Sequence, residues 1–155
     1  MQTDSALPLA DLKAALASGP RLRLAIVFGS GASGRMHQAS DIDIAIIPED
    51  ATLLLREELR LQVELTRVAG RNVDLVRLDR APTLVRYQVA KHGVALFESG
   101  PFEAARFKAA AVSEYLDFEP SLRRAAEVFR RRVAAGDSSP KALGDEFQVA
   151  IANLK

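Results

Sequence analysis

The chain has 155 residues, enough for one ordinary domain with a small appendage, and its 48% apolar and 26% charged residues are typical of a soluble globular protein rather than a disordered one. The net charge of +1 gives no general attraction to nucleic acid or to a membrane, and no apolar run approaches the ~20 residues that span a bilayer. Without cysteine the chain has neither disulfides nor thiolate metal sites, which is neutral on its compartment. Its first residues lack a signal-peptide pattern, so we expect a cytoplasmic protein, and the low net charge leads us to expect no direct binding of nucleic acid.

The first hundred residues alternate between helix and strand patterns. In chain order they predict a helix, two strands, a helix, a strand, a helix and a strand, over residues 7–18, 21–28, 41–47, 51–69, 72–78, 81–93 and 94–98. Gly19, Gly70 and Gly93 are the expected stops of the three helices. This order predicts an α/β core.

A helical pattern continues from Phe102, with expected breaks at Pro120 and around residues 136–141. We therefore predict two parts, a core over residues 1–100 and a helical tail over residues 101–155. The tail has one apolar stripe at spacings of three and four, which either covers the core or contacts another protein. Its members are Phe102, Ala105, Ala109, Val112 and Leu116.

Two carboxylates interrupt the isoleucine-rich strand over residues 41–47. Side chains alternate along a strand, so Asp41 and Asp43 should share one face, with Ile42 and Ile44 on the other. An isolated pair of this kind is most simply an exposed strand face. Together with Asp74 on a later strand, however, the pair could converge on divalent cations, which would offset the mutual repulsion of the carboxylates.

A glycine- and serine-rich turn precedes this strand. Gly29 and Ser30 directly follow an apolar strand, where backbone N–H groups and a hydroxyl can be aimed at a phosphate. A phosphate-binding turn beside paired carboxylates indicates a site for a metal-bound nucleotide.

Gly29-Ser30, ten intervening residues and then Asp41-Ile42-Asp43, followed by Asp74, resemble the signature of the DNA polymerase β-like nucleotidyltransferase superfamily. Over about residues 23–98 the chain resembles the minimal nucleotidyltransferases called MNT proteins. The segment over residues 113–133 is also similar to the C-terminal helices of MntA-type antitoxins, the partners of HEPN-domain toxins.

The resemblance implies a polymerase β-like palm, a mixed sheet flanked by helices, with a C-terminal helical tail. It also implies an enzyme that moves AMP from ATP to a hydroxyl, namely a tyrosine of the HEPN toxin. Asp41, Asp43 and Asp74 would be the catalytic residues and would bind two Mg²⁺ ions. Gly29, Ser30, Ser33 and Arg35 would bind the nucleotide. Ser33 stands where the family often has arginine, which would support the triphosphate.

Two alternatives to this enzyme stay open. One is a small-molecule nucleotidyltransferase of the antibiotic-modifying kind, although about 55 residues make a short substrate-binding domain. The other is a catalytically weak antitoxin that neutralises its toxin by binding alone. Ser33 in place of the usual arginine favours this alternative, whereas the presence of all three carboxylates argues against it.

Overall fold

A computed structural model describes residues 7–29 and 41–136 of the chain. All seven elements predicted in the first hundred residues are confirmed, with bounds that differ from the predicted ones by up to four residues. In chain order they are α1 (Leu9–Ser18), β1 (Leu22–Phe28), β2 (Ile42–Pro48), α2 (Leu55–Ala69), β3 (Val73–Arg77), α3 (Thr83–His92) and β4 (Val94–Glu98), and a long helix α4 (Glu103–Ala134) follows.

The four strands form one mixed sheet in the order β3-β2-β1-β4. β1 pairs antiparallel with both β2 and β4, whereas β2 and β3 run parallel. The parallel pair requires a crossover, and α2 supplies it. The N-terminal ends of β2 and β3 therefore lie at the same end of the sheet, next to the C-terminal end of β1.

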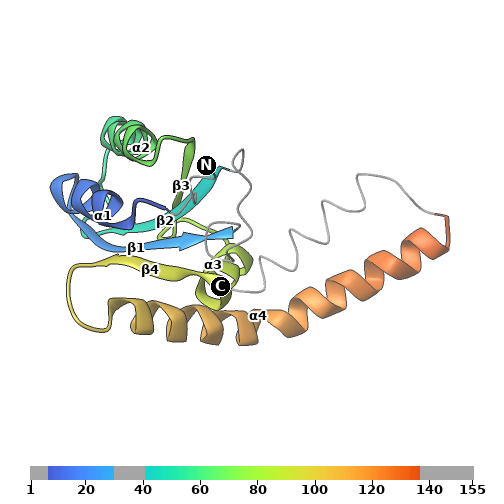
Figure 1. The fold of residues 1–155 in the computed structure, drawn as a ribbon. Helices are drawn as coiled ribbons and strands as arrows, with labels where there is room; N and C mark the ends of the chain where they lie inside the picture. Colours follow the sequence, from blue (N-terminus) through green and yellow to red (C-terminus); the bar gives the residue numbers. More distant parts are fainter. Residues whose placement is uncertain (1–6, 30–40, 137–155) are drawn as a thin grey trace. The chain divides into compact units, whose positions relative to one another are not determined.

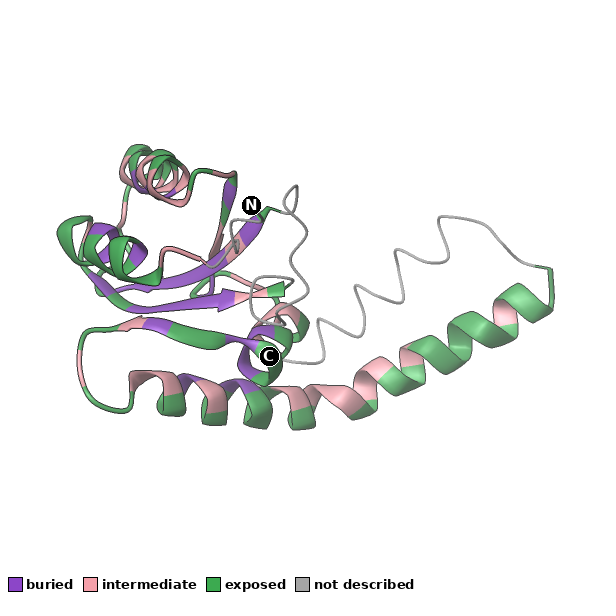
Figure 2. Cartoon of the chain, viewed as in Figure 1, coloured by how far each residue is buried: buried purple, intermediate pink, exposed green. Residues whose placement is uncertain are grey.

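Two apolar clusters cover the two faces of this sheet. One cluster joins α1 and α2 to Ile42, Ile44 and Ile46 of β2. The other joins α3 and the beginning of α4 to Ala45 and Ile47 of the same strand. Figure 1 shows the helices on opposite sides of the sheet, and Figure 2 shows that the buried positions concentrate on β1 and β2. Alternation along β2 thus assigns successive residues to different cores.

The chain divides into two compact units, Met1–Ala111 and Val112–Lys155. The first turns of α4 belong to the first unit, because Phe107 and Ala111 are buried in its second cluster. The predicted division into a core over residues 1–100 and a helical tail over residues 101–155 stays a prediction.

Helix α4 differs from the sequence prediction at Pro120. The expected break there is wrong, since α4 runs from Glu103 to Ala134 with Pro120 inside it. A proline removes one backbone hydrogen bond from a helix, and the remaining bonds of a 32-residue helix keep it continuous. Within residues 7–29 and 41–136, no helix combines the length and apolar character needed to cross a bilayer.

The predicted apolar stripe of the tail is exposed. The exposed fraction is 74% for Phe102 and 63% for Leu116, and Ala105, Ala109 and Val112 are exposed as well. The helix instead buries a different face, the one that carries Phe107 and Ala111. The interpretation of this stripe as core is therefore wrong for Phe102, Ala105 and Ala109, its members in the first unit, and its role as an interface stays a prediction.

Candidate active site

Three carboxylates gather at the end of the sheet where β2 and β3 begin. Asp41 directly precedes β2 and is exposed, Asp43 is the second residue of β2 and is half-buried, and Asp74 is the second residue of β3 and is exposed. Asp43 and Asp74 are direct partners in the parallel register of the two strands. Neighbouring strands lie about 4.8 Å apart, so their carboxylates are within reach of one ligand. We call these three residues the carboxylate edge.

The carboxylate edge faces away from α1 and α2. On β2 the isoleucines 42 and 44 enter the cluster under α1 and α2, so Asp43 between them faces the opposite side. On β3, Val73 and Leu75 lie in that same cluster, which directs Asp74 to the side of Asp43. The prediction that Asp43 faces the side opposite to Ile42 and Ile44 is confirmed.

The pKa of the Asp43 carboxyl reflects its burial and the two carboxylates beside it. Burial is the largest influence that raises the pKa of the Asp43 carboxyl above its ordinary value, and the negative charges of Asp74 and then Asp41 raise it further. Each of the three carboxylates thus contributes to one region of negative potential. A cation placed there would be attracted by all three charges.

Gly29 shapes the site through its lack of a side chain. It follows β1 with φ at +65°, a conformation that residues with a Cβ rarely adopt. A Cβ built on this residue would lie 2.5 Å from Oδ2 of Asp43, inside any real contact distance. Sequence reasoning expected Gly29 to bind nucleotide and missed this second role, because the contact depends on the pairing of β1 with β2.

The carboxylate edge fits cations that share their coordination with a nucleotide. Among the described residues, no three His, Cys, Asp or Glu side chains are gathered tightly enough to hold a metal ion alone. Mg²⁺ is commonly bound by one or two carboxylates plus substrate phosphates, rather than by a complete protein cage. The paired Asp43 and Asp74, with Asp41 beside them, suit that mode of binding.

The expected nucleotide-binding loop lies largely outside the described residues. Ser30, Ser33 and Arg35 fall within residues 30–40, so their assignment to the nucleotide stays a prediction. Gly29 is the one member of that predicted set within the described ranges, and it lies directly against the carboxylate edge.

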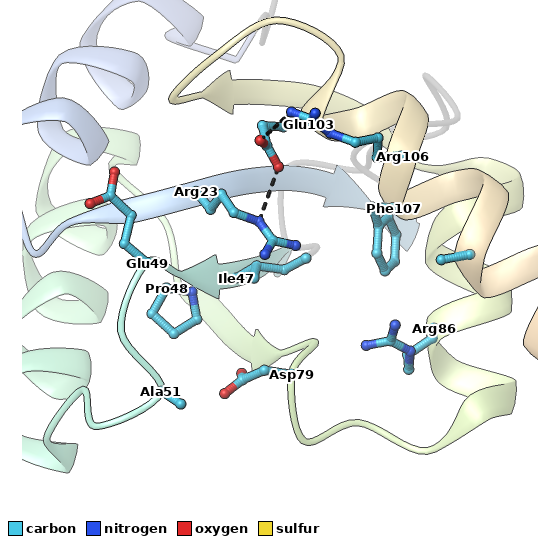
Figure 3. Close-up of a pocket in the computed structure, with 11 residues that line it drawn as sticks. Arg23, Ile47, Pro48, Glu49, Ala51, Asp79, Arg86, Glu103, Arg106 and Phe107 are labelled. Carbon is cyan, nitrogen blue, oxygen red and sulfur yellow. Dashed lines mark hydrogen bonds and ion pairs between the residues drawn. The ribbon is translucent and has the colours of Figure 1, made fainter.

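A hollow of about 610 Å³ lies at the other end of the same sheet face, beside the C-terminal end of β2 and the start of α4 (Figure 3). Its wall includes three arginines, but they interact within the wall. Arg23 binds Glu103 at 3.0 Å, Arg106 binds the same carboxylate at 2.6 Å, and the Arg86 guanidinium lies 5.5 Å from the Phe107 ring centre. Each of these arginines is therefore engaged by another residue of the wall.

Comparison with known proteins agrees with this geometry. The model of a family described as polymerase beta, nucleotidyltransferase, matches residues 10–101. Protein adenylyltransferase MntA of Shewanella oneidensis is 38% identical over 78 residues, which are 50% of this chain and 55% of that protein. The match thus spans about half the length of this curated relative.

Two solved structures resemble a larger part of the chain. A chain in a crystal structure of a toxin-antitoxin with AMP-PNP is 29% identical with a TM-score of 0.64, and the match covers 84% of this chain and 97% of that one. A chain in the complex of tri-AMPylated Shewanella oneidensis HEPN toxin with MNT antitoxin is 26% identical with a TM-score of 0.57, over 88% and 97% of the two chains. The predicted nucleotidyltransferase fold is confirmed.

Proposed function

The chain belongs to the polymerase beta nucleotidyltransferase family, and we propose that it is a protein adenylyltransferase that moves AMP from ATP to a tyrosine hydroxyl of a HEPN-domain toxin. The transfer would make it the antitoxin of a toxin–antitoxin pair. ATP as donor is consistent with a cytoplasmic reaction. The small-molecule nucleotidyltransferase and the antitoxin that acts by binding alone are the alternatives.

The observation that carries the proposal is the pairing of Asp43 with Asp74 across β2 and β3, with Asp41 close enough to raise the pKa of Asp43 further. A structural role would not require three mutually repelling carboxylates at one sheet end. The similarity to an adenylyltransferase and to complexes with AMP-PNP and with an AMPylated toxin supports ATP as donor and a HEPN protein as acceptor.

In the proposed reaction the acceptor oxygen attacks the α-phosphorus of ATP, the bond to the bridging oxygen breaks, and pyrophosphate leaves. Asp74, on the edge strand, would accept the proton of the attacking hydroxyl. Asp41 and Asp43 would hold two Mg²⁺ ions together with the phosphates, and Asp74 would help to bind the second ion. When bound, such ions neutralise charge on the reacting phosphate and on the leaving pyrophosphate. Ser30 and the N–H groups near Gly29 would orient the triphosphate.

The test is to purify the chain together with the product of the neighbouring gene, add ATP and Mg²⁺, and measure the intact mass of that partner. The proposal expects the partner to gain whole AMP units, and expects no gain with Asp43→Asn or with a partner whose acceptor tyrosine is phenylalanine. A tight complex without any AMP would favour the antitoxin that acts by binding. AMP transfer to small hydroxylated molecules but not to the partner would favour the small-molecule enzyme.

A further inference from the structure

The first residue of β3 is held by two side chains of α2. Thr66 Oγ1 accepts a hydrogen bond from the Val73 N–H at 3.1 Å, and Gln62 Nε2 donates to the Val73 carbonyl oxygen at 2.9 Å. Val73 directly precedes Asp74. We infer that Gln62 and Thr66 are positioning residues that hold Asp74 in place for AMP transfer, an inference that rests on the proposed function.

The position of β3 in the sheet explains why these bonds are needed. Within residues 7–29 and 41–136, β3 is an edge strand, because β2 is its one strand neighbour there. On the β2 side, the Asn72 carbonyl accepts from the Ile42 N–H at 2.9 Å, so the chain is fixed there just before Asp74. On the other side Val73 has no strand to bind. Gln62 and Thr66 satisfy its backbone N–H and carbonyl instead, which a buried residue requires.

The two side chains are well placed for this task. They are four residues apart on α2, so they lie on one face of the helix, one turn from each other. Both are half-buried, and Val73 itself is 0% exposed. Gly70 ends α2 in a left-handed conformation, and the short turn after it leads directly into β3. Helix α2 and the start of β3 are therefore connected twice, by the short turn and by the two side-chain hydrogen bonds.

Movement of Val73 would move Asp74, since the two residues share a peptide bond and point to opposite faces. Val73 faces the apolar cluster under α2, and Asp74 faces the site. Reactions of this kind are sensitive to position, and a displacement of ~1 Å can lower a rate about 100-fold. The Gln62 and Thr66 bonds thus couple the packing of α2 to the placement of the proposed proton acceptor.

The test uses variants that keep side-chain size but remove one bond. Thr66→Val removes the acceptor of the Val73 N–H, Gln62→Leu removes the donor to its carbonyl, and Thr66→Ser keeps the hydroxyl. Val68→Ala, another half-buried position of α2, is the control for a general loss of packing. AMP transfer to the HEPN partner is measured against ATP and Mg²⁺ concentration. Hydrogen exchange at the Val73 amide reports the bond itself.

Thr66→Val and Gln62→Leu are expected to lower the turnover number about 10- to 100-fold, to leave the KM for ATP within about 2-fold, and to raise the Mg²⁺ concentration that gives half the maximal rate. Thr66→Ser should keep the wild-type turnover number, because it keeps the hydroxyl. Val68→Ala should also keep the wild-type turnover number, even where it lowers the melting temperature as much as Thr66→Val does. In Thr66→Val the Val73 amide should exchange faster than in the wild type.

Wild-type turnover in Thr66→Val with faster exchange at Val73 would overturn the positioning role. So would an equal fall in turnover in the Val68→Ala control, because general packing would then explain the effect. Absence of AMP transfer by the wild type would instead refute the proposed function, which separates the two failures.

Discussion

Replacing Gly29 with alanine tests whether a side chain at this position is incompatible with the carboxylate of Asp43. Two separate effects are expected from the substitution. The first is backbone strain, because φ at +65° costs a residue with a Cβ about 1–2 kcal/mol of folding free energy. The second is steric, because the new Cβ would lie 2.5 Å from Oδ2 of Asp43.

The steric effect is the one that concerns function. Ordinary van der Waals contact begins at 3.4 Å, so the carboxylate must retreat by about 0.9 Å to accommodate the methyl group. A displacement of ~1 Å in a reacting constellation can lower the rate by about 100-fold. We therefore expect Gly29→Ala to fold, with a modest loss of stability, and to lose most of its AMP transfer.

Gly70 provides a matched control for the strain. Its φ is +66°, and a Cβ built there would meet no other atom within 4 Å. Gly70→Ala should lose a similar 1–2 kcal/mol in denaturant unfolding, yet keep wild-type transfer of label from α-labelled ATP to the HEPN partner. If Gly29→Ala and Gly70→Ala lose stability equally and both keep a wild-type rate, Gly29 does not constrain Asp43 and the reasoning is refuted.

Three further predictions concern other parts of the chain. Asp43→Asn should lower AMP transfer at least about 100-fold, and in metal-free buffer it should raise the melting temperature at pH 7. The pKa of the Asp43 carboxyl is raised in the folded state, so its ionised form disfavours folding when the pH is above that raised pKa. The gain in melting temperature of Asp43→Asn should therefore vanish as the pH falls through the raised pKa toward 3.8. A lower melting temperature of Asp43→Asn at pH 7 would contradict this. Arg77→Met should cost about 1.5–3 kcal/mol of unfolding free energy, because the buried guanidinium holds the Asp79 carboxylate at 2.6 Å. Arg67→Met, at an exposed pair, should leave the melting temperature unchanged. Phe107→Ala should cost about 3–5 kcal/mol through its cavity, while Leu116→Ala, on the exposed stripe, should cost under about 0.5 kcal/mol; equal losses for the two would mean that α4 does not pack through Phe107.

The helices and strands of the first hundred residues could be predicted because their patterns are local and strong. The strands β1 and β2 are nearly continuous apolar runs between turn residues, and burial on both faces of the sheet explains why they read that way. Gly70 ends α2 in the left-handed conformation that the sequence led us to expect. Such signals depend on few neighbours, so the tertiary structure does not override them.

Helix α4 shows where local pattern fails. The stripe that begins at Phe102 and the face that carries Phe107 both have apolar residues at helical spacing, and alanine contributes to each. Periodicity finds an amphipathic helix but does not choose between two apolar faces of similar size. Phe107 is selected because it packs in the cluster of α3 and lies beside the Arg86 guanidinium, and neither neighbour is near it in sequence.

The carboxylate edge depends both on a local sequence pattern in β2 and on the tertiary pairing of β2 with β3. Alternation along one strand is local, so the sequence by itself predicts that Asp41 and Asp43 share a face. The arrival of Asp74 beside Asp43 is not local, because it requires β3 to pair parallel with β2 and in one particular register. A shift of that register by one residue would turn Asp74 into the apolar cluster and bring Val73 to the site. The register is therefore itself a functional property, and the apolar alternation of β3, the bond from Ile42 to Asn72 and the two bonds from α2 to Val73 all act to fix it.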